Sequence, residues 1–387
     1  MTATPLLHWT EDGEPRAAMW RSERGAPPPA RVAIADDRLA TAEAYGLAAQ
    51  GTGLLWRGDF NNARQLLTAM AGRADRALLQ PAKSRAPPPS TPVDTFNRLR
   101  QVRAQRARTL GMLLIPLDAD FGVPLRRAPD VREACAEAYG PGTRPSVTSL
   151  RELLGIIGAH EWRRRGIEVP ALGGERIHPH YGVFAPVRGE YVDLVAREPL
   201  PAALASCDLA VDIGTGTGVL AAVLARRGIG RVIATDQSAR ALACARDNLA
   251  RLGLAPRVEV VEADLFADAR AALVVCNPPW VPARPSAPLE QGIYDADSRM
   301  LKGFLAGLSA HLVPGGEGWL ILSDLAEHLG LRSRDELLGA IAGAGLVVAG
   351  RSDARPHHPR VFDRADPLHA ARRAEVTSLW RLRSAAT

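Results

Sequence analysis

Short apolar runs alternate with amphipathic stretches along the second half of the chain. The apolar runs predict buried strands at 208–213, 231–236, 257–261, 271–276, 316–323, 346–351 and 376–383. Between them, apolar residues at helical spacing predict helices at 188–197, 217–228, 238–253, 298–312 and 333–344. Strands and helices that alternate through short turns form a mainly parallel sheet with helices on both faces. Ligands of such a sheet bind at the carboxyl ends of its strands.

The first part of the chain has a less regular pattern. Residues 1–80 mix short helical and extended patterns, and helices are expected at 61–70, 94–110 and 146–165. The proline-rich segment 81–93 predicts a flexible or polyproline connector. Because 387 residues are long for one domain, we expect two. Residues 1–165 would form a mixed α/β or mainly helical domain for substrate recognition or an accessory role, and residues 166–387 the α/β domain.

The strand at 208–213 runs into the turn Gly214-Thr215-Gly216-Thr217-Gly218. Glycines allow positive φ and a close approach of the backbone to a ligand, and the helix behind the turn offers free N–H groups. The dinucleotide pattern GxGxxG would need a third glycine at 219, where Val219 stands, which argues against nicotinamide or flavin. Asp236 ends the next strand, 236 − 212 = 24 residues after Asp212. That spacing is close to the one at which an acid meets the ribose of a nucleotide.

Asn277-Pro278-Pro279-Trp280 follows the apolar run at 271–276. The nitrogen of an amide or an aromatic amine is a poor nucleophile because its lone pair is delocalised. The Asn277 side-chain oxygen and the Pro278 carbonyl can accept its N–H protons, and the prolines hold both acceptors rigidly. Trp280 offers a flat face for stacking a planar amide or base, so we expect an exposed indole there.

Together the glycine turn and the Asn-Pro-Pro-Trp (NPPW) stretch resemble motifs of class I S-adenosylmethionine-dependent methyltransferases that modify nitrogen. The group includes release-factor glutamine methyltransferases (HemK-like), DNA adenine-N6 methyltransferases and small-domain ribosomal RNA guanine-N2 methyltransferases. The resemblance covers about 181–323, and the order of its motifs and the segment 183–186 favour the glutamine family. Two features depart from that family: Val187-Arg188-Gly189-Glu190 replaces an Arg-Pro-Glu-Thr-like run, and the front region is longer.

The resemblance implies a seven-stranded Rossmann-like sheet, S-adenosylmethionine as cofactor and a set of site residues. The implied cofactor residues are Asp212, Gly214, Thr215, Gly216, Thr217, Gly218, Asp236, Gln237, Asp264, Leu265 and Asn277. Among these acids, Asp212 would hold the methionine ammonium, Asp236 the ribose and Asp264 the adenine amino group. The implied catalytic residues are Asn277, Pro278, Pro279 and Trp280, and the implied substrate contacts are Phe184, Pro186, Arg188 and Trp280. For Arg188 a structural salt bridge with Glu190 is the favoured alternative.

Charge is concentrated in the front part of the chain. The formal net charge is +6; residues 1–150 carry 20 Lys+Arg and 15 Asp+Glu, whereas residues 151–387 carry 28 and 27. Part of the excess is the run Arg98, Arg100, Arg103, Arg106 and Arg108. This run could face phosphates, although a solvated helix face is the favoured explanation.

Several classes of site and location are not indicated. The cysteines at 135, 207, 244 and 276 form no CxxC pair, so neither zinc nor a disulfide framework is expected, and Cys244 and Cys276 fit core positions. His178, His180, His357 and His358 lack further residues at ligand spacing, so no metal is expected. No signal peptide or membrane-length apolar run is evident, so we expect a cytoplasmic protein without membrane contact.

Three functions remain open. The first is methylation of a protein glutamine, for example in a translation factor. The second is methylation of an RNA or DNA base, guanine N2 or adenine N6, with the basic front domain gripping the nucleic acid. The third is a cofactor-binding interaction protein without catalysis, which the intact Asn277 and double proline disfavour. The sequence leaves the acceptor, the oligomeric state and the role of the loop 352–375 open.

Overall fold

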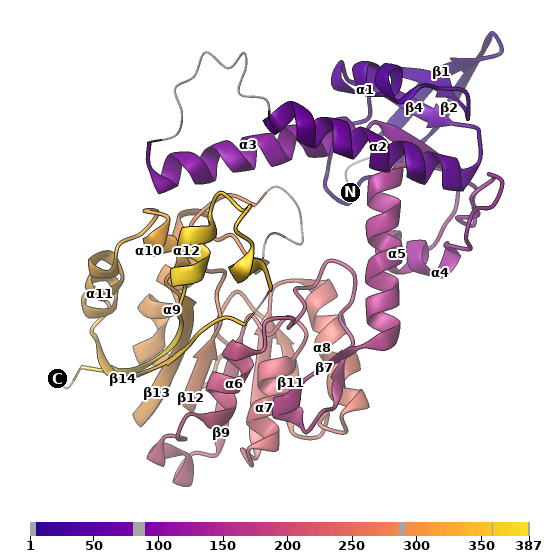
Figure 1. Cartoon of the computed structure of the whole chain (residues 1–387). Helices are drawn as coiled ribbons and strands as arrows, with labels where there is room; N and C mark the ends of the chain where they lie inside the picture. The colour runs from indigo at the N-terminus through magenta and orange to yellow at the C-terminus, as the bar shows by residue number, and fades with distance from the viewer. Residues whose placement is uncertain (1–4, 80–89, 286–289, 291, 358, 386–387) are drawn as a thin grey trace. The chain divides into compact units, whose positions relative to one another are not determined.

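The computed structural model describes residues 5–79, 90–285, 290, 292–357 and 359–385. The chain divides into two compact units, residues 1–161 and 162–387 (Figure 1). The division falls in the last turn of helix α5 (Leu150–Arg165). That unit 1 recognises the substrate remains a prediction. Most of the expected proline-rich connector at 81–93 lies outside the described residues. Its last two residues, Pro92 and Val93, are not connector but the start of a helix.

Unit 1 is built on a six-stranded mixed sheet in the order β1-β2-β6-β5-β4-β3. Its strands are β1 (Leu6–Glu11), β2 (Glu14–Trp20), β3 (Arg31–Ala35), β4 (Thr52–Trp56), β5 (Leu113–Leu117) and β6 (Ser146–Ser149). A two-residue turn joins β1 to β2, and both its residues, Asp12 and Gly13, have positive φ, as tight hairpins require. Strands β3, β4 and β5 are parallel. The first unit is therefore mixed α/β, the first of the two predicted alternatives.

The helices of unit 1 are α1 (Thr41–Ala49), α2 (Phe60–Leu79), α3 (Pro92–Leu110), α4 (Arg132–Tyr139) and α5. Helix α3 begins two residues before the predicted 94–110, because Thr91 caps it by accepting a hydrogen bond from the Asp94 N–H and Pro92 occupies the first turn. The prediction of one helix over 146–165 is wrong at its start. Residues 146–149 are the β-strand β6, paired with β5 and β2, and they are mostly buried. A four-residue strand whose partners are distant in the chain leaves too short a local pattern to recognise.

Unit 2 contains a seven-stranded sheet in the order β11-β10-β9-β12-β13-β15-β14. The strands are β9 (Leu209–Ile213), β10 (Arg231–Asp236), β11 (Val258–Glu262), β12 (Ala271–Cys276), β13 (Leu312–Ser323), β14 (Leu346–Ala354) and β15 (Thr377–Ser384). The first five in spatial order are parallel, and β15 is antiparallel to both its neighbours. The predicted class I methyltransferase fold is thereby confirmed. The chain reverses its direction of strand addition between β9 and β12, the place where such sheets bind ligands.

Helices cover both faces of this sheet. They are α6 (Glu190–Arg197), α7 (Val219–Arg226), α8 (Ala239–Arg251), α9 (Arg299–Leu308), α10 (Leu325–His328), α11 (Arg334–Gly343) and α12 (His369–Ala374). Alternate residues of β12 enter two separate apolar clusters: Leu273 and Val275 pack with α6, α7 and α8, whereas Val274 and Cys276 pack with α9 and α11. Both Cys244 and Cys276 are buried core residues, as predicted.

Smaller features complete unit 2. The strands β7 (Ile167–Glu168) and β8 (Arg176–Ile177) pair with each other, and 3-10 turns lie at 170–172, 202–205, 296–298, 309–311 and 359–362. The predicted capping box of α11 is confirmed, since Ser333 and Glu336 each accept from the other's backbone N–H. The segment taken as a loop at 352–375 contains the end of β14 and helix α12. Within the described residues, none of the helices is long and apolar enough to cross a membrane.

Candidate active site

A cavity of about 220 Å³ lies at the carboxyl ends of β9, β10 and β12. Its wall contains every predicted cofactor residue except Gly218: Asp212, Gly214, Thr215, Gly216, Thr217, Asp236, Gln237, Asp264, Leu265 and Asn277. A larger hollow of about 670 Å³ is lined by α6 and the end of β14 and holds none of these residues. Size therefore does not single out the site. The cavity where parallel strands end, lined by a glycine turn and carboxylates, does.

The glycine turn needs its glycines for two different reasons. Gly214, Gly216 and Gly218 all have positive φ, between 54° and 82°. A Cβ on Gly214 would lie 2.5 Å from the Met300 Cε, so the flexible end of the Met300 side chain would have to move to admit a side chain there. A Cβ on Gly218 would instead lie 3.3 Å from the Ala245 Cβ on α8. Gly218 thus serves the close packing of α7 on α8, and the structure does not bring it to the cavity.

Asp212 is a buried carboxylate without a cationic partner among the described residues. Its Oδ2 accepts hydrogen bonds from the Thr215 hydroxyl at 2.6 Å and from the Ala221 N–H at 3.1 Å. Burial raises the pKa of Asp212 to about 6, while these two hydrogen bonds act in the opposite direction. A cation brought to this wall of the cavity would relieve the cost of the buried negative charge.

Asp236 fastens the glycine turn to the end of β10. Its Oδ2 accepts from the Gly216 N–H at 3.1 Å and its Oδ1 from the Ser238 N–H at 2.9 Å. Each carboxylate oxygen can accept a further hydrogen bond, so both remain available to hydroxyl groups of a ligand.

Two further predicted cofactor residues, Asp264 and Leu265, lie in the same wall. Asp264 pairs with Arg299 at 2.6 Å, and both side chains are more than half exposed. Leu265 has a φ of 77°, and its carbonyl accepts from the Thr235 hydroxyl at 2.6 Å. This hydrogen bond holds an unusual backbone conformation that places Leu265 in the cavity wall.

The NPPW stretch follows β12 and meets the cavity through Asn277 and Pro279. Trp280 does not line it. Its indole is partly buried against both apolar clusters, and its Nε1–H donates to the Asn277 Oδ1 at 2.8 Å. The expectation of an exposed indole is therefore wrong, because the large apolar ring system of tryptophan packs where the core is within reach.

The predicted substrate contacts divide in the same way. Phe184 lines the cavity, whereas Pro186, Arg188 and Trp280 do not. The Arg188 guanidinium donates to the Glu190 Oε1 at 2.7 Å and to the Glu375 Oε1 at 3.0 Å. The structural salt bridge between Arg188 and Glu190, the favoured alternative, is confirmed.

The cavity wall also contains residues that the sequence did not predict, among them Tyr191, Gly292, Arg299 and Met300. Arg299 and Met300 open α9, and the Asp295 carboxylate caps this helix by accepting from the Met300 and Leu301 N–H groups at 3.0–3.2 Å. One available signal was the start of the helix predicted after β12, since that end lies at the ligand-binding edge. For Tyr191 and Gly292 the sequence offers no comparable signal.

Residues 176–334 match the family model described as Methyltransferase small domain. The predicted resemblance to class I methyltransferases is confirmed. A release factor glutamine methyltransferase of Cereibacter sphaeroides is 35% identical over 151 residues, which cover 35% of this chain and 52% of that protein. A ribosomal protein L11 methyltransferase of Pelotomaculum thermopropionicum is 47% identical over 145 residues, covering 37% and 39%.

A solved ribosomal protein L11 methylase from Lactobacillus delbrueckii subsp. bulgaricus has 18% identity and a TM-score of 0.33, and the match covers 51% of this chain and 78% of that one. The chain spans about half the length of the release factor methyltransferases it matches. The similarity to methyltransferases identifies S-adenosylmethionine as the cofactor of unit 2. This similarity is confined to part of unit 2 and does not identify the methyl acceptor.

The cavity fits S-adenosylmethionine by its chemistry. Backbone without side chains at Gly214 and Gly216 leaves room for a ligand that a Cβ would fill. Asp212 presents a buried carboxylate to a cationic ammonium group, and Asp236 keeps acceptor capacity for two ribose hydroxyls. When bound, this cofactor supplies an electrophilic methyl group on a positively charged sulfur.

Proposed function

We propose that unit 2 is the catalytic part of an S-adenosylmethionine-dependent N-methyltransferase whose acceptor is a protein glutamine side-chain amide. The observation that carries this proposal is the shared cavity of Asn277, Asp212 and the Gly214–Gly216 turn. The Asn277 amide after one strand and the cofactor-binding turn after another thus face one space, as transfer between two bound molecules requires.

The chemistry asked of the chain is orientation. A planar NH2 group must turn its nitrogen lone pair toward the methyl donor while its two protons are held. The Asn277 Oδ1 has one acceptor position left beside the Trp280 indole. By resemblance to the family, the Pro278 carbonyl supplies a second acceptor; Pro278 itself is buried, between the cavity-lining Asn277 and Pro279. Because two prolines follow Asn277, the backbone between these acceptors has little freedom, so they are preorganised.

The glutamine acceptor is supported by the relatives and by the order of motifs. Several of the matching proteins are named release factor glutamine methyltransferases, at 31–38% identity over 119–170 residues. In this chain, as in that family by resemblance, the glycine turn precedes the Asn-Pro-Pro-aromatic stretch. A translation factor is accordingly the proposed class of partner.

Asn277→Ala tests the proposal. We expect the variant to lose methyl transfer while its cofactor affinity stays within a few-fold, because Asn277 holds the acceptor and the turn holds the cofactor. Transfer is measured as tritium incorporated from labelled S-adenosylmethionine into a cell lysate, and affinity by titration calorimetry. Label that protease removes and ribonuclease leaves identifies a protein acceptor. Wild-type transfer by Asn277→Ala would contradict the assigned role.

A second candidate acceptor, an RNA base, is favoured by one feature of unit 1. Helices α2 and α3 together carry eight arginines and two aspartates. No acidic residue occurs between Thr95 and Leu117, and Arg98, Arg103 and Arg108 on α3 are exposed. A cationic helix of this kind attracts the phosphates of nucleic acid in a strongly salt-dependent way.

The two acceptors are separated by the digestion experiment and by a charge variant. If RNA is the acceptor, ribonuclease removes the label, and Arg98→Gln/Arg103→Gln lowers transfer several-fold at 150 mM salt. The matched control is Arg197→Gln/Arg364→Gln, which removes two exposed arginines from unit 2. Equal transfer by both double variants would count against RNA, and absence of label with intact cofactor binding would indicate a non-catalytic protein.

A further inference from the structure

We propose that Trp280 is a positioning residue: its indole N–H fixes the Asn277 amide, and Arg188 fixes the indole. This inference deepens the proposed function and rests on it. It replaces the stacking platform that the sequence predicts for Trp280. The set Asn277, Trp280, Arg188, Glu190 and Glu375 is called the indole brace below.

The hydrogen bond between Trp280 and Asn277 determines how the amide is turned. An indole nitrogen can only donate, so the amide atom 2.8 Å from Nε1 is the oxygen. The amide NH2 then points away from the indole, and the oxygen retains one acceptor position. An amide rotated by half a turn would place two donors against each other. The indole thereby selects the rotamer that leaves an acceptor, and not a donor, for an incoming N–H.

The ring of Trp280 is enclosed in a way that a stacking platform would not be. The Arg188 guanidinium lies 4.8 Å from the ring centroid, a cation–π distance. Residues of both apolar clusters pack against the same side chain. The ring is thus occupied where a planar substrate would need open surface. The aromatic side chains in the cavity wall are instead Phe184 and Tyr191.

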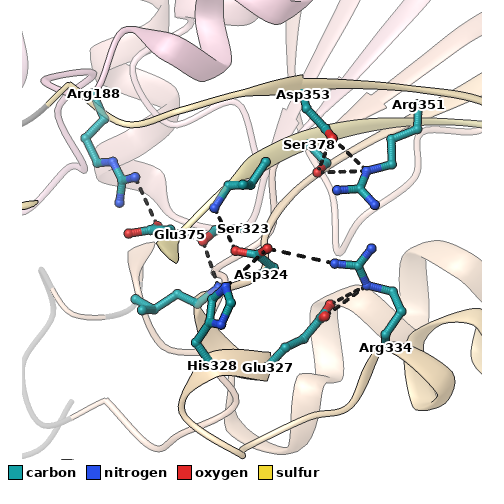
Figure 2. A network of polar contacts seen from close by, with 12 residues as sticks. Arg188, Ser323, Asp324, Glu327, His328, Arg334, Arg351, Asp353, Glu375 and Ser378 are labelled. Atoms are coloured by element: carbon teal, nitrogen blue, oxygen red, sulfur yellow. Dashed lines mark hydrogen bonds and ion pairs between the residues drawn. The ribbon is translucent and has the colours of Figure 1, made fainter. Parts of the chain in front are cut away.

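Arg188 is itself held on two sides. It donates to Glu190 at 2.7 Å and to Glu375 at 3.0 Å, and these carboxylates are 7% and 2% exposed. Figure 2 shows the guanidinium directed at the Glu375 carboxylate. A planar guanidinium donates in several fixed directions, so it can bridge two carboxylates and cover a ring at once, which an ammonium group cannot do.

The far end of the indole brace is anchored in the sheet. Ser323, the last residue of β13, donates to the Glu375 Oε1 at 2.6 Å and accepts from the Leu325 N–H at 3.0 Å (Figure 2). Glu375 stands two residues before the first residue of strand β15, and Asn277 directly follows β12. The amide at the cavity is therefore tied to the ends of neighbouring strands. Side chains locked in this way keep reacting groups within the small tolerance that catalysis allows.

The contact itself can be tested without any acceptor. With 15N-labelled tryptophan, the indole N–H signal of Trp280 is identified among those of the seven tryptophans by its absence in Trp280→Phe. We expect Arg188→Ala to shift this signal and to speed its hydrogen exchange at least several-fold. The matched control is Arg351→Ala, because the Arg351 guanidinium lies 4.7 Å from the Trp380 ring and pairs with Asp353. The control should move the Trp380 signal and leave that of Trp280 in place. An unmoved Trp280 signal in Arg188→Ala overturns the brace.

The role in transfer is tested by initial rates with saturating tritiated S-adenosylmethionine and a fixed amount of lysate. Trp280→Phe keeps an aromatic ring but removes the N–H, so we expect about tenfold slower transfer with cofactor affinity within a few-fold of wild type. Arg188→Ala should slow transfer similarly, and the double variant should be little slower than either single one, because both act through Asn277. Arg351→Ala should transfer at the wild-type rate.

The outcomes separate this inference from the proposed function. An inactive wild-type protein contradicts the proposed function. An active wild type together with a fully active Trp280→Phe contradicts only the positioning role and restores the stacking platform. Full additivity of Arg188→Ala and Trp280→Phe also contradicts it, since independent effects would mean that the two residues do not act through one amide. If the unfolding midpoints of the variants stay near that of wild type, slower transfer cannot be attributed to loss of folding.

Discussion

Two buried carboxylates on the same sheet, Asp212 and Glu317, have opposite surroundings. Asp212 lines the cavity and accepts hydrogen bonds from Thr215 and Ala221. It has no cationic partner within the described part of the chain, and burial raises its pKa to about 6. Glu317 on β13 is also fully buried. It accepts from Arg381 on β15 at 2.7 Å and 2.8 Å, and from Arg383.

The two acids differ in whether nearby arginines compensate the buried negative charge. Burial would raise the pKa of Glu317 as well, but Arg381 and Arg383 outweigh it and lower that pKa to about 2. A buried acid with its own counter-charges is a completed structural element. A buried acid without them costs stability when ionised, and the folded chain carries that cost only because something else stabilises the carboxylate or uses it. The comparison assigns Glu317 to the sheet and supports the proposed role of Asp212 in holding the cofactor.

The largest expected effect is on the compensated acid. Glu317→Ala removes a fully buried carboxylate that accepts from Arg381 and Arg383, and among the described acids it leaves Arg381 with only its 3.6 Å contact to Glu198. We therefore expect the free energy of unfolding to fall by about 3–5 kcal/mol. Urea unfolding measures it. The matched control is Glu259→Ala, whose partner Arg231 is 62% exposed and whose loss should cost about 0–1 kcal/mol. Equal losses for both variants would show that burial of the pair does not matter.

Asp212→Asn should act in the opposite direction on stability. Because the folded-state pKa of about 6 lies above the ordinary 3.8, the folded state of the wild type loses stability as pH rises from 3.8 to 6. The loss amounts to about 3 kcal/mol for a shift of this size. The asparagine variant lacks this component, so at pH 8 it should be more stable than wild type and should bind S-adenosylmethionine more weakly. Parallel unfolding curves for the two proteins between pH 4 and pH 8 would refute the uncompensated charge.

The smallest expected effect concerns the acid at the end of β10. Asp236→Ala removes a charged acceptor toward the ribose and frees the Gly216 N–H, so cofactor binding should weaken by about 1.5–3 kcal/mol. Titration calorimetry measures this change. Asp264→Ala serves as the comparison, because Asp264 is 59% exposed and already paired with Arg299, and its loss should cost less. A larger loss of cofactor affinity in Asp264→Ala than in Asp236→Ala would contradict the primary role given to Asp236.

Much of unit 2 could be predicted because its signals are local. A fully buried parallel strand such as β12 is a continuous apolar run, and the glycine turn and NPPW stretch stand directly after such runs. In unit 1 the strand β6 was missed, since its four residues gain their structure from β5, more than 25 positions earlier. Tyr191 and Gly292 could not be predicted as cavity residues either, because segments distant in the sequence bring them to the cavity wall.

The sequence alone determined the order of the seven main strands of unit 2, the glycine turn and the Asn277 amide beside a proline pair. Only the tertiary structure decided that Arg188 covers Trp280 and that Glu375, 187 positions away, holds Arg188. It also decided that Glu317 has counter-charges, whereas Asp212 has none among the residues that the structure describes. The physical reason is the distance along the sequence over which each property is determined. Backbone conformation follows from neighbouring residues, whereas the charge, burial and hydrogen-bond partners of a side chain depend on which remote segments the fold brings beside it.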